Sequence, residues 1–155
     1  MVGERGRRAG RPDWRPAPVP AAVFGELPTT CGLPARVWMC RPEAVVGQKV
    51  QALWHHGMLR WRPKDLNDLR LLLDRLPLDA GLLQQAVTAA FVEMGGSGAD
   101  ARALFGPAAW WGTKQAAARW GDFTRSRWAA GAPAELAAVV ATVAGRLAVV
   151  LEGVP

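Results

Sequence analysis

Three charged residues, Lys64, Asp65 and Asp68, are grouped within the segment RWRPKDLNDLRLLLDRL, which begins at Arg60. On a helix, Lys64 and Asp68 are i,i+4 neighbours, and Asp65 and Asp68 are i,i+3 neighbours. Acidic side chains near the start of a helix interact favourably with the helix dipole. The group is therefore interpreted either as a capping and solubility feature of an ordinary helix or as one side of a chemical site.

Lys49 favours the second interpretation. The chain contains 16 arginines and only three lysines, and two of these lysines, Lys49 and Lys64, are 15 residues apart. In an arginine-rich chain, a lysine indicates a need for a compact ammonium group that binds phosphate or tunes a neighbouring acid. We therefore expect Lys49, Lys64, Asp65 and Asp68 to lie around one concavity, with the charged turn at least partly exposed.

The helices that must position these residues are predicted from the spacing of apolar side chains. A helix is expected from Lys64 to Leu76, where Pro77 stops it. Its buried face is formed by five leucines, Leu66, Leu69, Leu72, Leu73 and Leu76. An earlier helix is expected from Glu43 to about Gly57. Its buried face is formed by Val46, Val50, Leu53 and Trp54.

Further helices are expected between this pair and the C-terminus. Asp79 is a predicted N-cap for a third helix, the segment GGSG at 95–98 ends it, and a short helix follows over 101–105. Thr113 is a predicted N-cap for the segment KQAAARWGDFTRSRW. The side chains expected to lie together on that helix are Ala117, Trp120, Phe123 and Trp128. The last helix is expected to open at Pro133 and to be packed against the core.

The N-terminal part differs in character from these helices. A short apolar strand is expected from Ala35 to Cys40, and no second strand is evident to pair with it. Residues 1–28 are rich in proline and arginine, with four prolines between Pro12 and Pro20, so they are expected to form a disordered leader. The predicted fold is mostly α, a helical bundle of five or six helices after one lone β-strand, in a domain over 29–155.

Charge and hydropathy limit the choice of partners and location. The net charge of +6 is compatible with a polyanionic partner, although five of the arginines occur within the first 20 residues. The N-terminus lacks the apolar segment of a signal peptide, and the most apolar run, from Ala137, contains Arg146 and is too short to span a bilayer. Cys31 and Cys40 fit no metal spacing and could pair, but a reducing environment is favoured. We therefore expect a cytoplasmic protein without a membrane partner.

Three further motifs are interpreted as structural. The segment GGSGAD has the glycines of a phosphate-binding loop but lacks the lysine and the preceding strand, so a linker is favoured. His55 and His56 are adjacent, cannot share one helix face, and lack the acid that would complete a zinc motif. Trp110 and Trp111 could stack on a base, but such a pair more often fills the core at a helix junction.

The segment RVWMCRPEAVVGQKVQALWHHGMLRWRPKDLNDLRLLLDRL resembles the AbiEii/AbiGii nucleotidyltransferase toxin family. In that family a short strand is followed by a helix of the pattern E-x-V-V-A-E-K and then by R-x-K-D-x-x-D-L. The residues that match the two patterns are Glu43, Val45, Val46, Lys49, Arg62, Lys64, Asp65, Asp68 and Leu69. With the later helices, the resemblance covers roughly residues 35 to 152.

The resemblance implies a bacterial type IV toxin–antitoxin toxin of the kind linked to abortive infection and phage defence. Such enzymes transfer a nucleotide from a nucleoside triphosphate to an acceptor such as tRNA, with Mg²⁺, and have an antitoxin encoded nearby. The resemblance assigns Lys49, Lys64 and Arg62 to phosphate binding. It assigns Asp65 and Asp68 to orienting the lysines, or Asp65 to the role of general base.

Two departures from the family pattern are evident. Gln48 stands where the family has a glutamate before the first lysine. Residues 1–34 contain only three acids, Glu4, Asp13 and Glu26, and no D-x-D pair, whereas the family holds Mg²⁺ through paired carboxylates in an N-terminal half. This comparison predicts a fragment that holds no metal and no cofactor by itself and is inactive alone. The fragment is expected to be a degraded copy, a truncated gene model, or one half of a split enzyme that pairs with a separately encoded nucleotidyltransferase half.

Two alternatives remain open from the sequence. One is a non-enzymatic basic helical module that binds RNA or an acidic protein partner. The other is a helical domain of unrelated function that shares K-D-x-x-D-L by chance.

Overall fold

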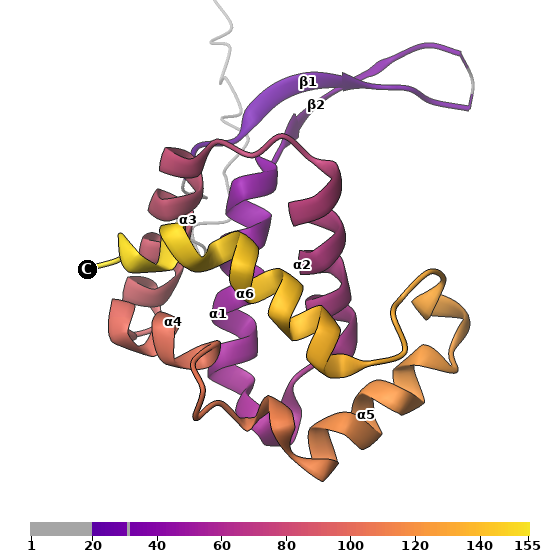
Figure 1. Cartoon of the computed structure of the whole chain (residues 1–155). Helices are drawn as coiled ribbons and strands as arrows, with labels where there is room; N and C mark the ends of the chain where they lie inside the picture. The colour runs from indigo at the N-terminus through magenta and orange to yellow at the C-terminus, as the bar shows by residue number, and fades with distance from the viewer. Residues whose placement is uncertain (1–19, 31) are drawn as a thin grey trace, which may run out of the picture.

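The computed structural model describes residues 20–30 and 32–155, and within these it contains six α-helices, two 3₁₀-helices and one sheet of two strands. The elements in chain order are β1 (Val23–Leu27), β2 (Ala35–Met39), α1 (Pro42–Arg60), α2 (Pro63–Arg75), α3 (Ala80–Glu93), α4 (Gly98–Leu104), η1 (Trp110–Gly112), α5 (Lys114–Thr124), η2 (Arg127–Ala129) and α6 (Leu136–Glu152). Figure 1 shows a hairpin that projects from a body of packed helices. The predicted mostly helical fold with five or six helices is confirmed.

The strand expected at residues 35–40 is present, but it is not alone. It pairs antiparallel with β1, in a register that places Phe24 opposite Trp38 and Glu26 opposite Arg36. The prediction of a lone strand is therefore wrong, and so is the prediction of a disordered leader for Val23–Leu27. Strand β1 was not predicted from the sequence, because Gly25 interrupts its apolar pattern and prolines flank it. Residues 1–19 of the expected leader lie outside the described residues.

The first predicted helix is confirmed, and it ends close to the expected glycine. Pro42 lies in its first turn, and Gly57, with a φ of 53°, interrupts the helix before a last turn that reaches Arg60. Its packing against α3 depends on Gly47. A Cβ atom on Gly47 would lie 2.6 Å from the carbonyl oxygen of Ala86, so the two helices approach each other at a position that admits no side chain.

The leucine face of α2 is buried as predicted along most of its length. Leu66 and Leu69 are fully buried, Leu73 is nearly so, and Leu72 packs partly buried against the core. Leu76 is 41% exposed, because the helix ends at Arg75 and the chain leaves the core there. The buried leucines fix the rotation of α2, and its charged first turn is directed toward α1 as a result.

Capping residues explain where the next helices begin. The side chain of Asp79 accepts a hydrogen bond from the Leu82 amide at the start of α3, and that of Thr113 accepts one from the Ala116 amide at the start of α5. Both predicted caps are confirmed. The GGSG segment ends α3, but it also starts α4 at Gly98 through a capping box between Ser97 and Asp100.

The helix predicted after Thr113 is longer than the helix in the structure. Helix α5 ends at Thr124, so Trp128 lies in η2 and is 66% exposed instead of packing beside Trp120 and Phe123. Ala117 is also exposed, and its neighbour Ala116 is the buried residue. The side chains of Trp120 and Phe123 do pack together, with ring centroids 5.3 Å apart.

The last helix and the tryptophan pair complete the core. Helix α6 begins at Leu136, three residues after Pro133, and its apolar stripe is buried. Trp110 and Trp111 pack against Trp61, with ring centroids 5.4 and 5.2 Å from it, so the prediction that this pair fills the core is confirmed. Among the described residues, no helix is both long enough and apolar enough to cross a membrane.

Candidate functional site

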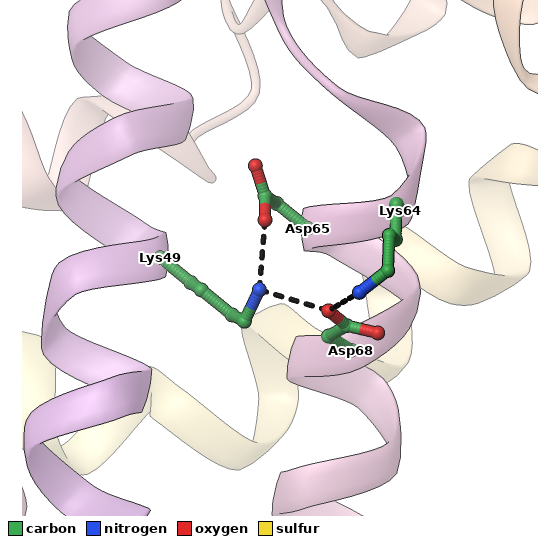
Figure 2. Close-up of polar contacts among 4 residues, drawn as sticks. All are labelled: Lys49, Lys64, Asp65 and Asp68. Carbon is green, nitrogen blue, oxygen red and sulfur yellow. Dashed lines mark hydrogen bonds and ion pairs between the residues drawn. The ribbon is translucent and has the colours of Figure 1, made fainter. Parts of the chain in front are cut away.

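The four residues singled out in the sequence are joined by one hydrogen-bonded network between two helices. The ammonium group of Lys49 on α1 donates to Oδ1 of Asp65 at 2.7 Å and to Oδ2 of Asp68 at 2.8 Å, both on α2. The ammonium group of Lys64 donates to the same Oδ2 of Asp68 at 2.6 Å. Figure 2 shows the Lys49 side chain extending from α1 to a point between the two carboxylates. We call these four residues the Lys–Asp quartet.

The quartet is divided between a half-buried part and an exposed part. The side chains of Lys49, Asp65 and Asp68 are 19%, 17% and 23% exposed, whereas that of Lys64 is 63% exposed. The predicted gathering of these residues on one side of the molecule is confirmed. A cavity of about 630 Å³ lies elsewhere, along α3, and no member of the quartet lines it. The predicted concavity around the quartet therefore stays a prediction.

Lys49 and Asp68 are each held in the charged form by their neighbours. Burial lowers the pKa of Lys49, but hydrogen bonds and attraction from Asp65 and Asp68 outweigh it and raise the pKa above its ordinary value. Burial raises the pKa of Asp68, but the two lysine ammonium groups outweigh it and lower the pKa below its ordinary value. The contacts between Lys49 and Asp68 therefore favour the charged form of both groups.

This arrangement restricts what the aspartates can do. Asp68 accepts hydrogen bonds from two ammonium groups and has a lowered pKa, so it is a weak proton acceptor suited to holding the lysines in place. Asp65 is bonded to Lys49 alone among the quartet. A divalent cation at these carboxylates would have to displace lysine ammonium groups, so the quartet does not fit a Mg²⁺ site. Among the described residues, no cluster of three or more histidines, cysteines, aspartates or glutamates could hold a metal ion.

One residue that the sequence analysis did not select, Arg119, supports the turn that leads into the site. The guanidinium group of Arg119 on α5 donates to the carbonyl oxygens of Leu59 and Trp61 at 2.9 and 3.0 Å. It therefore fixes the turn between α1 and α2, in which Arg62 is exposed. Nothing in the sequence distinguished Arg119 from the other fifteen arginines.

Glu43 matches the family pattern, but none of its described contacts is with the quartet. Its side chain is 4% exposed, and Oε1 accepts a hydrogen bond from the Asp79 amide at 3.0 Å. Glu43 therefore connects the start of α1 to the start of α3 and complements the positive end of that helix. This role is not evident from the sequence, because it depends on how α1 and α3 cross.

The fold and the quartet together define a helical domain that holds a lysine between two aspartates of a neighbouring helix. A family model described as the nucleotidyl transferase AbiEii toxin of type IV toxin–antitoxin systems matches residues 9–133. The chain therefore belongs to the AbiEii family of nucleotidyltransferase toxins. The match begins before the resemblance seen in the sequence and ends before α6. No curated protein and no solved structure matches the chain.

Membership of a type IV toxin family identifies the general function. The chain is related to nucleotidyltransferase toxins, and a toxin of this kind has an antitoxin partner. The quartet residues Lys49, Lys64, Asp65 and Asp68 all lie within the matched range.

Proposed function

We propose that this chain takes part in transferring a nucleotide from a nucleoside triphosphate to an RNA acceptor such as tRNA, and that it does so in the cytoplasm. One observation carries the proposal. The Lys49 ammonium group is held between two carboxylates from another helix, 2.7 and 2.8 Å away, within a chain of the AbiEii family. A lysine held in this way is preorganised to stabilise the negative charge that develops as pyrophosphate leaves.

The proposed roles follow from exposure and charge. Lys64, which is 63% exposed, is the first contact for the triphosphate, and the exposed Arg62 lies two residues before it. Lys49 is less exposed and acts on the phosphate that approaches most closely. Asp68 orients both lysines, since its lowered pKa makes it a poor base. Asp65 orients Lys49 or accepts the proton of the incoming hydroxyl group.

We propose further that the quartet assists a metal site and does not form one. Mg²⁺ would supply charge neutralisation at the triphosphate, and carboxylates other than Asp65 and Asp68 would hold it. A separately encoded nucleotidyltransferase half is the proposed source of those carboxylates. In this scheme the chain presents the phosphate-side cations to a partner that holds the metal.

The test is triphosphate binding by lysine variants, measured with a fluorescent ATP analogue. Lys64→Met is the sharpest variant because Lys64 is exposed and its loss leaves the bonds of Lys49 in place. We expect Lys64→Met and Lys49→Met each to weaken binding about tenfold, through loss of a charge-assisted contact. Lys114→Met removes the third lysine, exposed at the start of α5, and should change binding less than about twofold.

The same variants distinguish the proposed function from a basic binding module. Binding through the quartet should fall with added salt, as phosphate contacts do. If Lys114→Met weakens triphosphate binding as much as Lys64→Met, the binding reflects net charge, and the proposed site is wrong. If the wild type binds RNA but no triphosphate, and all three variants bind RNA as the wild type does, the non-enzymatic alternative is correct.

A further inference from the structure

The hairpin formed by β1 and β2 is built unlike the rest of the molecule. It projects from the helical body (Figure 1), and within the described residues neither strand pairs with a third one. A sheet of two strands is marginally stable alone and presents an open edge on each side. A surface that packs on the hairpin would therefore stabilise it.

The hairpin also carries much of the exposed apolar surface of the chain. Phe24 is 49% exposed, Trp38 71%, Leu27 45% and, in the loop between the strands, Leu33 75%. Phe24 and Trp38 are opposite each other in the register, and their ring centroids are 5.2 Å apart. Clustered exposed side chains of this size mark a binding surface, whereas single ones do not.

Charged residues on the same face indicate what kind of partner fits. Glu26 and Arg36 are the next cross-strand pair, 3.8 Å apart, and the Arg36 guanidinium lies 5.0 Å from the Phe24 ring centroid. This face therefore carries one positive and one negative charge and is neutral. A neutral aromatic face does not fit a polyanion, although the chain as a whole has a net charge of +6.

The same face is complementary to a copy of itself. Under a two-fold axis parallel to the strands, the face of a second hairpin presents Glu26 toward Arg36 and Arg36 toward Glu26, while the two aromatic rows meet beside these ion pairs. An acidic or basic partner would leave one of these two charges unmatched. Because the hairpin projects from the body, two copies can pair through it while their positively charged bodies stay apart.

We propose that the chain forms a two-fold homodimer through the face defined by Phe24, Glu26, Arg36 and Trp38. Phe24 and Trp38 provide the apolar part of the interface. Glu26 and Arg36 form two symmetric ion pairs between the copies and set their relative orientation. This inference concerns a surface separate from the Lys–Asp quartet and does not depend on the proposed function.

The first test measures mass against concentration by multi-angle light scattering on the full chain. The wild type should approach twice the 16.6 kDa of one chain as concentration rises. Trp38→Ser should raise the dimer dissociation constant at least about a hundredfold, since central tryptophans dominate such interfaces. Trp128→Ser is the matched control, because Trp128 is 66% exposed but lies in η2, and it should leave the dimer unchanged. A wild type that stays monomeric, or two serine variants that behave alike, overturns the proposal.

The second test separates pairing between copies from stability of the hairpin itself. Glu26→Arg and Arg36→Glu should each weaken the dimer about tenfold, because two ion pairs become two repulsions. Mixing the two variants in equal amounts should restore a dimer, since one then carries two positive charges and the other two negative ones. Rescue on mixing cannot arise within one hairpin. If mixing the two variants does not restore a dimer, the proposal is wrong. It is also wrong if the wild type is monomeric and Trp38→Ser loses RNA binding, because the face would then bind RNA.

Discussion

Lys49 and Asp68 are 19 residues apart in the sequence and belong to different helices, yet the lysine ammonium lies 2.8 Å from the aspartate carboxylate. The same carboxylate oxygen accepts a hydrogen bond from Lys64 at 2.6 Å, so one atom of Asp68 connects both lysines. Asp68 therefore couples the position of Lys49 on α1 to that of Lys64 on α2.

We expect Asp68→Asn to destabilise the fold at neutral pH. The substitution keeps the size of the side chain but removes the negative charge that faces two ammonium groups, in a residue that is only 23% exposed. The expected loss in the free energy of unfolding is about 1–3 kcal/mol, measured by urea unfolding at pH 7. Asp74→Asn is the control on the same helix, because Asp74 is 56% exposed and lies 3.5 Å from Arg146. It should change stability by less than about 0.5 kcal/mol.

The stability that Asp68 contributes should disappear at acid pH. Its pKa in the folded protein is below the ordinary value of 3.8, so the contribution is complete above 3.8 and is lost as the pH falls through the folded pKa. The difference in unfolding free energy between the wild type and Asp68→Asn should therefore shrink between pH 7 and pH 3. A difference that stays constant over this range would show that the substitution acts through packing and not through charge.

Two glycine substitutions should have opposite effects. Gly47→Ala places a methyl group 2.6 Å from the Ala86 carbonyl and forces α1 away from α3, which should cost about 1–3 kcal/mol. Gly145→Ala lies in α6, where an added Cβ meets nothing within 4 Å, and should stabilise the protein by about 0.5–1 kcal/mol. Thermal unfolding followed by circular dichroism measures both. Equal effects of the two substitutions would contradict the close approach at Gly47.

Glu43 should be needed for stability and not for phosphate binding. Glu43→Ala removes the acceptor for the Asp79 amide at the start of α3 in a buried position, and the expected cost is about 1–3 kcal/mol. Triphosphate binding by the folded fraction should stay within about twofold of the wild type, since the exposed Lys64 is untouched. Weaker binding at full folding would place Glu43 in the site after all.

The helices could be predicted because their signals are local. The leucine spacing of α2 and the caps Asp79 and Thr113 are read from neighbouring residues, and each was found where the pattern placed it. The scarcity of lysine directed attention to Lys49 and Lys64, and their grouping with the two aspartates is present in the structure. What the pattern could not provide was the distance between α1 and α2, because that depends on how their buried faces pack.

The features that were missed depend on contacts between distant residues or on weak local signals. The strand β1 is interrupted by Gly25 and became a strand through pairing with β2. Helix α5 ends at Thr124 without a glycine or proline, so nothing in the sequence separated Trp128 from it. The role of Glu43 could not be predicted either, because it depends on how α1 and α3 cross.

We expect the chain alone to transfer no nucleotide, because both acids of the quartet are already occupied and the described residues contain no cluster that could hold a metal ion. Asp65 and Asp68 accept hydrogen bonds from lysine ammonium groups at 2.6 to 2.8 Å, and these must be displaced before either carboxylate binds Mg²⁺. Transfer from a triphosphate requires carboxylates that hold the metal beside the phosphates. The assay incubates the chain with Mg²⁺, each labelled nucleoside triphosphate and total tRNA, with Asp68→Asn and Asp74→Asn in parallel. Labelled tRNA that forms with the wild type would show that the expectation is wrong, and its loss with Asp68→Asn but not with Asp74→Asn would show that the transfer depends on the quartet.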